Sequence, residues 1–267
     1  MNEIIKKLGD EFEKMEKTIA FQQKVIASMP QTQVCPCGFA PAASIPVVPK
    51  LKLDDCSWYE IALYAQSGMA DKVFATGDTK KVMLTNGSVI HVRIIGSNHD
   101  ENDIGQINPL TFESVETLDE DFCMNEKTTN EGGWEKSLLR SRLNGHFFNS
   151  LLPDDLKAVI KPTAKLTSTG GRNPKMGKTI DKLFVLSEQE IFGRKIYSLG
   201  GEGHWYDWYK RENTEYGKCK QSGERDWRWE RSPRSSNATY FCIVNGSGNA
   251  TNYTASGSRG MSFGFCV

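Results

Sequence analysis

The N-terminal segment carries a hydrophobic repeat that constrains its fold more than any other feature of the chain. Positions spaced alternately by three and four residues are apolar except for one glutamine, and Glu, Lys, Asp and Gln fill the positions between them. This narrow a/d seam predicts a parallel coiled coil over residues 1–29. A helix packed on its own globular domain is the alternative. The seam positions are Ile5, Leu8, Phe12, Met15, Ile19, Gln22, Ile26 and Met29.

The seam residues do not by themselves separate a dimer from a trimer, and by analogy we expect a homotrimer. Pro30 ends the helix because proline cannot continue the hydrogen-bond ladder. Prolines are dense beyond it, which predicts an extended linker over residues 30–52. Cys35 and Cys37 in this linker form a Cys-x-Cys pair that suits a metal or a cross-link between chains, but no second pair follows at zinc-ribbon spacing. We interpret them as two thiols in a linker.

Residues 53–267 combine helix and strand patterns in the order expected of one α+β domain. Ser57 and Glu60 form a capping box that predicts a helix ending near Ser67, and Asn86-Gly87 predicts the turn of a hairpin. Further helices are expected over 134–148 and 154–160, from Ser187, and as a turn or two over 205–213. Strands are expected over 81–84, 89–95, 107–115, 164–168, 181–186 and 261–267, and in short segments beyond Arg225.

The charge balance excludes several function classes. The 33 Lys and Arg residues match the 33 Asp and Glu residues, so no overall positive field attracts nucleic acid or anionic lipid. No stretch approaches the roughly 18 apolar residues of a membrane span, and the charged N-terminus lacks the apolar centre of a signal peptide. We therefore expect a protein made in a cytoplasm, without a nucleic-acid partner and without membrane insertion.

Catalytic patterns are absent or incomplete in the sequence. Gly171 and Gly177 are separated by five residues where a P-loop has four, and a strand rather than a helix is expected to follow. The polar run 98–103 lacks the spacing of a calcium loop and predicts a solvated turn, and His91 on its strand is expected to be structural. The sequence thus predicts no catalytic residue, no metal and no cofactor.

The C-terminal region has the composition of a contact surface. In Arg225–Pro233, alternation places Trp227, Trp229 and Arg231 on one strand face and Arg228 and Glu230 on the other. Residues 234–259, called here the display segment, hold five Ser, four Asn, three Thr and two Tyr, and no carboxylate. Tyr supplies rigid contact area, and Ser, Asn and Gly supply adaptable hydrogen bonding, as in antibody paratopes. A polar loop region of a β protein is the alternative.

Several short motifs are spread along the globular part of the chain. They are Ser57-Trp-Tyr-Glu-Ile61, Gly77-Asp-Thr-Lys80, Asn98-His-Asp100, Gly132-Gly-Trp-Glu135, Leu139-Arg140, Leu143-Asn144, Asp181–Phe184, Ser187-Glu188, Arg231-Ser-Pro233 and Gly264-Phe-Cys266. Together they resemble a family of uncharacterised domains of phages and prophages of gut Firmicutes, over roughly residues 55–267. The family usually carries Trp-Trp-Leu-Arg-Ser-Pro near its end, where this chain has Trp227-Arg-Trp-Glu-Arg-Ser-Pro233.

The resemblance implies a C-type-lectin-like fold, related to formylglycine-generating enzymes and used by the variable proteins of diversity-generating retroelements. It implies a non-enzymatic virion protein, a tail or head fibre, that binds a host-surface glycan or protein and contacts other virion proteins through its stalk. The calcium-dependent sugar motifs of true C-type lectins are absent. The expected contact residues are Trp229, Arg234, Ser235, Ser236, Asn237, Thr239, Tyr240, Asn245, Ser247, Asn249, Asn252, Tyr253, Ser256, Ser258 and Arg259.

Two alternatives from other classes remain. One is an oxidase of the formylglycine-generating type, with Cys242 and Cys266 as a redox or copper-binding pair, which would require a perturbed thiolate. The two cysteines are more simply small hydrophobic residues on strands. The other is a purely structural virion protein whose polar C-terminal region contacts other virion subunits.

Overall fold

The computed structural model describes Ala20, Gln23 and residues 50–267. The eight seam positions and the Cys35 and Cys37 pair lie outside the described residues, so the coiled coil, the trimer and most of the linker stay predictions. The domain begins slightly earlier than predicted. The amide of Leu51 donates to the carbonyl of Val73 at 3.0 Å, and the ammonium of Lys50 donates to the carbonyl of Phe74 at 3.2 Å.

The described residues form a mixed α/β protein with many strands and few helices. The larger antiparallel sheet has the strand order β1-β2-β3-β13, and a second antiparallel sheet has the order β11-β10-β9. Their bounds are β1 (Thr79–Met83), β2 (Val89–Glu101), β3 (Ile107–Ser114), β13 (Gly264–Cys266), β9 (Arg228–Pro233), β10 (Tyr240–Val244) and β11 (Ala250–Thr254). Three two-stranded pairs complete the strands: β4 (Phe122–Cys123) with β12 (Ser258–Arg259), β5 (Thr163–Ser168) with β6 (Met176–Asp181), and β7 (Lys218–Cys219) with β8 (Arg225–Asp226).

Two helices begin at capping boxes. Ser57 and Glu60 cap α2 (Trp58–Gln66), as predicted, and Ser187 and Glu190 cap α6 (Glu188–Phe192). The C-cap of α6 is Gly193 in the left-handed region, with φ 72°. The other helical elements are the single 3₁₀ turn η1 (Leu53–Asp55), α3 (Ala70–Val73), α4 (Leu138–Arg142), the π-helical segment η2 (Leu143–Leu151) and α5 (Asp154–Lys157).

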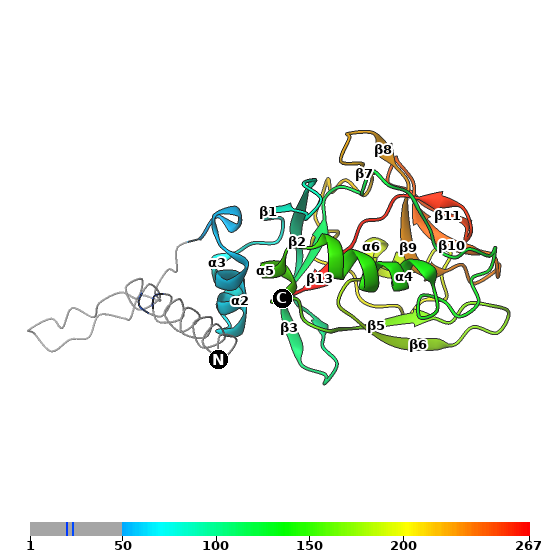
Figure 1. Ribbon diagram of the computed structural model, residues 1–267. Coiled ribbons are helices and arrows are strands. Elements are labelled where there is room, and N and C mark those ends of the chain that lie inside the picture. The colour runs from blue at the N-terminus through cyan, green and yellow to red at the C-terminus, as the bar shows by residue number, and fades with distance from the viewer. Residues whose placement is uncertain (1–19, 21–22, 24–49) are drawn as a thin grey trace, which may run out of the picture.

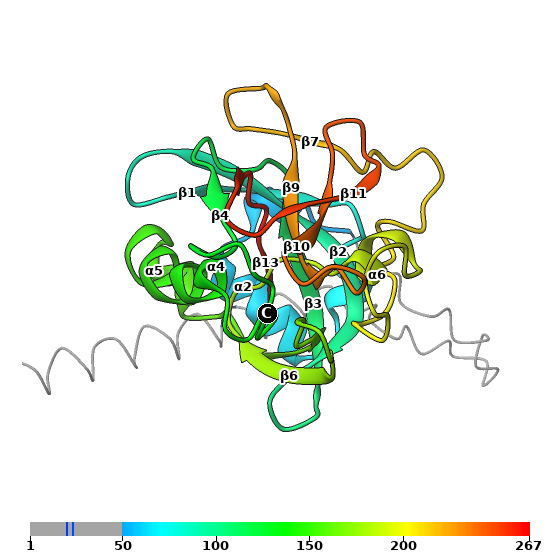
Figure 2. The same cartoon turned by 90° about the vertical axis from the view of Figure 1, so that its right-hand side faces the viewer.

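The two sheets lie at different ends of the domain. In Figure 1, α2 and α3 cover one side of the larger sheet, while α4, α6 and the β9–β11 sheet lie on the other side. Figure 2, turned by 90°, shows β9, β10 and β11 toward the viewer with α2 behind them. The display segment therefore lies at the end of the domain opposite to its first α-helix.

Several predicted elements were displaced. The helix predicted over 134–148 begins at Leu138, because Ser137 is its N-cap, and it continues as the π-helical segment. A strand was predicted over 181–186, but the strand in this region, β6, lies earlier in the chain, at Met176–Asp181. The predicted helix over 205–213 is a series of turns, and α5 stops at Lys157. These short segments are held by tertiary contacts that periodicity does not reveal.

The terminal strand was predicted correctly. Residues 261–267 are all buried, although only Gly264–Cys266 pair as β13, with β3. The amide of Val267 donates to the carbonyl of Leu110 at 3.0 Å. The rings of Phe112 and Phe265 stack with their centroids 5.1 Å apart. Trp58 forms a T-shaped contact with each of them, with centroid distances of 5.5 Å to Phe112 and 5.8 Å to Phe265. The chain end is thus part of the core between the larger sheet and α2.

Candidate functional site

Strand β9 supports the display segment and is buried on both faces. Both of its faces are covered, because Arg228, Glu230 and Arg231 are as inaccessible as Trp229. The pairing of β9 with β10 shifts register between Phe241 and Ile243. Such a bulge breaks the simple alternation of side chains.

Arg231 belongs to a buried group of five residues, called here the core ion cluster: Asp100, Lys165, Glu190, Tyr206 and Arg231. The Arg231 guanidinium binds both carboxylate oxygens of Glu190, one of them at 2.8 Å. Lys165 Nζ contacts Asp100 Oδ1 at 2.5 Å, Glu190 Oε1 at 3.1 Å and the Tyr206 hydroxyl at 2.7 Å. Burial alone would raise the pKa of Glu190, but Arg231 and Lys165 outweigh it and hold that pKa below its ordinary value.

Arg228 forms a second buried group on the same strand. Its Nη1 lies 3.2 Å from Glu113 Oε1, and its Nη2 donates to the Tyr209 hydroxyl at 3.0 Å. The Tyr209 hydroxyl donates to Glu113 Oε2 at 2.6 Å, and Lys218 Nζ lies 3.1 Å from the same oxygen. Arg228 therefore joins the β9–β11 sheet to the larger sheet and to the turns around residue 209, while Arg231 joins it to α6.

The display segment covers the outer side of this support. Only Phe241–Val244 and Ala255 are buried within it. Trp229, predicted to contact ligand, is 0% exposed and donates its indole N–H to the carbonyl of Phe122 at 2.6 Å, so it is a core residue. Among the other predicted contact residues, Ser235, Ser236, Ser247, Asn249 and Ser258 are exposed, and Arg234, Asn237, Thr239, Tyr240, Asn245, Asn252, Tyr253, Ser256 and Arg259 are partly exposed.

Some of these polar side chains serve the turns of the display segment. Asn237 Oδ1 accepts from the amide and hydroxyl of Thr239 at 2.9 and 2.6 Å. Asn245 Oδ1 accepts from the amides of Ser247 and Asn249 at 3.0 and 2.9 Å. Asn237 and Asn245 therefore each bond within their own turn of the segment, which leaves these side chains less adaptable than the composition suggested.

Two arginine–aromatic groups lie on the surface of the segment. The Arg259 guanidinium stands 3.6 Å from the ring centroid of Tyr253 and 5.3 Å from that of Trp227. Arg234 lies 5.6 Å from the ring of Tyr197 and 5.9 Å from that of Tyr240, and its Nη1 donates to Asn252 Oδ1 at 2.8 Å. Trp, Tyr and Arg are the residues that dominate binding energy at interfaces.

Trp227 is an exposed aromatic residue that the sequence analysis did not include among the expected contact residues. It is 42% exposed and lines a cavity of about 560 Å³ together with Glu215, Arg225 and the β10–β11 turn, Asn245–Ser247. Alternation had grouped it with Trp229, which is buried. Its position just before β9, where the chain leaves the buried sheet, accounts for the difference.

Asn130 fixes the first part of the display segment from beneath. This buried side chain donates from Nδ2 to the carbonyls of Arg234, Asn237 and Tyr240 at 3.3, 2.9 and 2.8 Å. Its Oδ1 accepts from the amide of Gly171 at 2.8 Å. The glycine-rich loop between β5 and β6 is thereby joined to the segment, and the two border a cavity of about 620 Å³ that includes Arg172 and Thr239.

Replacing Asn130 with alanine is expected to lower the free energy of unfolding by about 2–3 kcal/mol, because partly buried carbonyls and an amide lose the hydrogen bonds of this buried side chain. Hydrogen–deuterium exchange should show faster exchange of the amides of residues 234–240. Asn149→Ala is the matched control, since the exposed Asn149 only donates to Gly145 in its own helical segment. Equal exchange in both variants would contradict the assigned role.

A further cavity, of about 440 Å³, lies beside the core ion cluster and is lined by His99, His204, Lys178 and Gln189 among others. The predicted solvated turn at 98–103 is wrong, because β2 continues through Glu101 and buries Asp100. Asn98 adopts a left-handed backbone with φ 52°, and the His99 ring stacks on Tyr206 at 4.0 Å. Asp100 and Lys165 are engaged with each other, which leaves neither as a free acid or base.

The two cysteines of the oxidase alternative have different surroundings. Cys242 lies on β10 near Glu188 and Glu230, whereas the Cys266 sulfur lies 3.4 Å from the Thr111 hydroxyl on β3. Burial raises the pKa of Cys266 to about 12, and burial together with nearby carboxylates raises the pKa of Cys242 well above its ordinary value. Both thiols are therefore protonated at neutral pH without a bound metal, the reverse of an activated thiolate.

The fold and the site define a mixed α/β domain whose ion-paired sheet carries an exposed polar segment. The chain belongs to the family described as a domain of unknown function (DUF6273), whose model matches residues 110–267. No curated protein matches the chain, and no solved structure matches it. Among the described residues, none of the helices has the length and apolar character needed to span a membrane.

Proposed function

We propose that this chain is a non-enzymatic binding protein of a phage or prophage virion and that its display segment attaches to a host-surface glycan or protein. The observation that carries the proposal is the pair of arginine–aromatic groups on the surface of the display segment. Buried ion pairs of β9 hold the sheet that supports this segment. A rigid support reduces the entropy lost on binding. A C-type-lectin-like fold is part of the proposal.

The cavity beside Trp227 favours a glycan as the ligand. An indole face offers a flat apolar surface, and Glu215, Arg225 and Asn245 surround it with charged and amide groups. Binding sites commonly join an apolar wall with a few polar groups that fix orientation. The polar composition of the display segment also suits a segment diversified by a retroelement.

The stalk contributes avidity in this proposal. A homotrimer held by the seam over residues 1–29 presents three copies of the segment, and multivalent attachment raises overall affinity by about 10²-fold or more where the geometry permits. Contact of the stalk with other virion proteins would place the chain in the virion. The position of the display segment opposite to α2 agrees with this arrangement.

Replacing Trp227 with alanine is expected to weaken binding by about 30-fold, the effect of losing an interface residue worth roughly 2 kcal/mol. Arg259→Ala should act in the same direction, because it removes the cation stacked on Tyr253. Binding of the full chain and its variants would be measured on a glycan array and on intact bacterial cells.

Arg142→Ala is the matched control, since Arg142 is exposed on α4 outside the display segment. Periodate treatment of the cells should abolish binding to a glycan, and protease treatment should abolish binding to a protein. Unchanged binding by Trp227→Ala and Arg259→Ala would contradict the proposed surface. A chain that binds no cell or glycan but assembles into virions would favour the purely structural alternative.

A further inference from the structure

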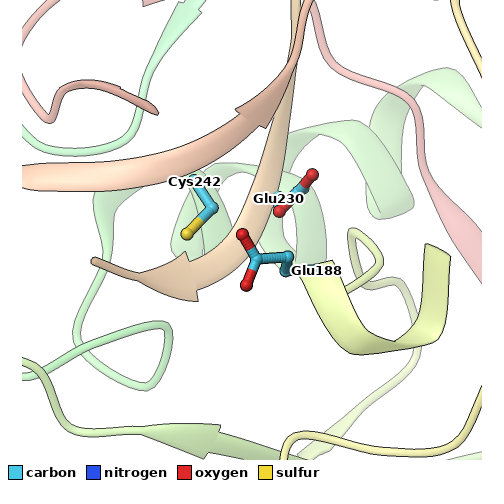
Figure 3. A group of neighbouring side chains, drawn as sticks. All are labelled: Glu188, Glu230 and Cys242. Carbon is cyan, nitrogen blue, oxygen red and sulfur yellow. The ribbon is translucent and has the colours of Figure 1, made fainter. Parts of the chain in front are cut away.

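Three buried side chains lie between the β9–β11 sheet and α6. They are called here the Glu188 cluster: Glu188, Glu230 and Cys242. One carboxylate oxygen from each glutamate and the Cys242 sulfur all lie within 4.8 Å of one another. Figure 3 shows the three side chains meeting from three elements, the start of α6, β9 and β10. All three residues are buried.

Glu230 is buried without a hydrogen-bond partner in the part of the chain that the structure describes. It is 0% exposed, and neither of its carboxylate oxygens has a hydrogen-bond partner among the described residues. A buried polar group without a partner costs roughly 1–3 kcal/mol, and more when it is charged. The guanidinium groups nearest along the strand are engaged elsewhere, Arg228 with Glu113 and Arg231 with Glu190.

Glu188 is held in the position expected of a ligand. Its carboxylate accepts hydrogen bonds from the amides of Ile196, Tyr197 and Ser198 at 2.7 to 3.0 Å. Carboxylates that bind metals are themselves oriented by such outer hydrogen bonds. The Glu188 side chain is thus held in place by backbone amides, and it faces the Glu230 carboxyl group and the Cys242 thiol.

We propose that the Glu188 cluster binds a divalent zinc ion through Glu188, Glu230 and Cys242. A cation would provide a partner for the Glu230 oxygens, which have none among the described residues, and would join them to the Glu188 carboxylate and the Cys242 sulfur. Sulfur and two oxygens suit zinc, whereas calcium and magnesium take oxygen ligands only. A tetrahedral zinc ion places its ligand atoms about 3.3–3.8 Å apart, so small side-chain rotations close the cluster around it.

Binding releases the protons of two ligands. The zinc–sulfur bond forms as the Cys242 thiol gives its proton to solvent, and the Glu230 carboxyl does the same when it becomes a ligand. No electron is transferred. Because the cluster lies inside the domain, the ion is taken up during folding and ties β9 and β10, which support the display segment, to α6.

The test measures zinc in the full chain purified from zinc-supplemented cells, in a Cys35→Ser/Cys37→Ser background that removes the linker thiols. About one zinc per chain is expected. Cys242→Ser and Glu230→Gln should each lower zinc occupancy by about tenfold or more. Cys123→Ser is the control, since Cys123 is a partly buried thiol outside the cluster, and it should keep its zinc.

A second measurement keeps the proposal testable if a variant folds poorly. The chain would be unfolded with a chelator and refolded with cobalt(II), which reports a bound thiolate by a charge-transfer absorption band. The band should appear in the parent chain and be absent from Cys242→Ser. Zinc below a tenth of an equivalent in the folded parent, or zinc retained by both ligand variants, would overturn the proposal.

Discussion

Replacing Arg231 with methionine is expected to lower the free energy of unfolding by about 3–5 kcal/mol, the usual effect of removing one partner from a buried ion pair. The change leaves the buried Glu190 carboxylate with the ammonium of Lys165 and the amide of Ser187 but without its guanidinium partner. It also removes the donors to the carbonyls of Val185 and Glu202 at 3.1 and 2.6 Å. Urea denaturation followed by fluorescence and circular dichroism measures the loss.

Arg225→Met is the matched control for this prediction. Arg225 pairs with Glu215, but the two side chains are 57% and 64% exposed, so solvent screens the pair and its loss should cost less than about 1 kcal/mol. A double-mutant cycle between Arg231→Met and Glu190→Gln should give a coupling free energy above about 1 kcal/mol, because the residues bind each other directly. Additive effects would contradict the assigned pair.

Replacing Glu202 with glutamine is expected to change how stability depends on pH. Burial, opposed by hydrogen bonds from Ser232 and Ser168 and by the charge of Arg231, raises the pKa of Glu202 to about 7. The folded chain therefore keeps this carboxyl neutral between pH 4.5 and 7, whereas the unfolded chain ionises it. Below pH 4.5 the neutral Glu202 carboxyl makes its full contribution to the free energy of unfolding. This contribution is lost as the pH rises from 4.5 through about 7.

The variant and the parent should have similar stability near pH 4, and the variant should be more stable by about 3 kcal/mol near pH 8, at equal zinc content. Glutamine keeps the acceptor for the Ser168 amide, which Glu202 Oε1 binds at 2.8 Å. Urea denaturation over this pH range tests the difference. Glu120→Gln, at an exposed position, should follow the parent at every pH. A constant offset between Glu202→Gln and the parent would show that ionisation of Glu202 is not the cause.

Local patterns predicted the elements whose formation depends on neighbouring residues. The capping box at Ser57 and Glu60 begins α2, and Asn86-Gly87 forms the turn between β1 and β2, where Gly87 has φ 85°. The terminal strand was also found, because a short apolar run with β-forming residues points to a buried strand. The polar composition of 234–259 predicted a mostly accessible segment, and most of its residues are accessible.

The same patterns failed where distant residues decide burial. Alternation assigned Arg228 and Arg231 to opposite faces of one strand but did not predict that both are buried, because their partners Glu113 and Glu190 lie on β3 and α6 and cannot be found from spacing. The polar residues 98–103 predicted a solvated turn, but Lys165 of β5 binds Asp100 inside the domain. No local signal distinguished Trp227 from Trp229.

The sequence by itself determined the starts of α2 and α6, the hairpin, the buried terminal strand and the polar character of the display segment, because each depends on residues a few positions apart. Tertiary structure decided which charged residues are buried and which indole is exposed. It also brought Glu230 and Cys242 of the β9–β11 sheet together with Glu188 of α6. A buried charge is stable only beside its partner, and the chain brings these partners together only when the two sheets and α6 pack.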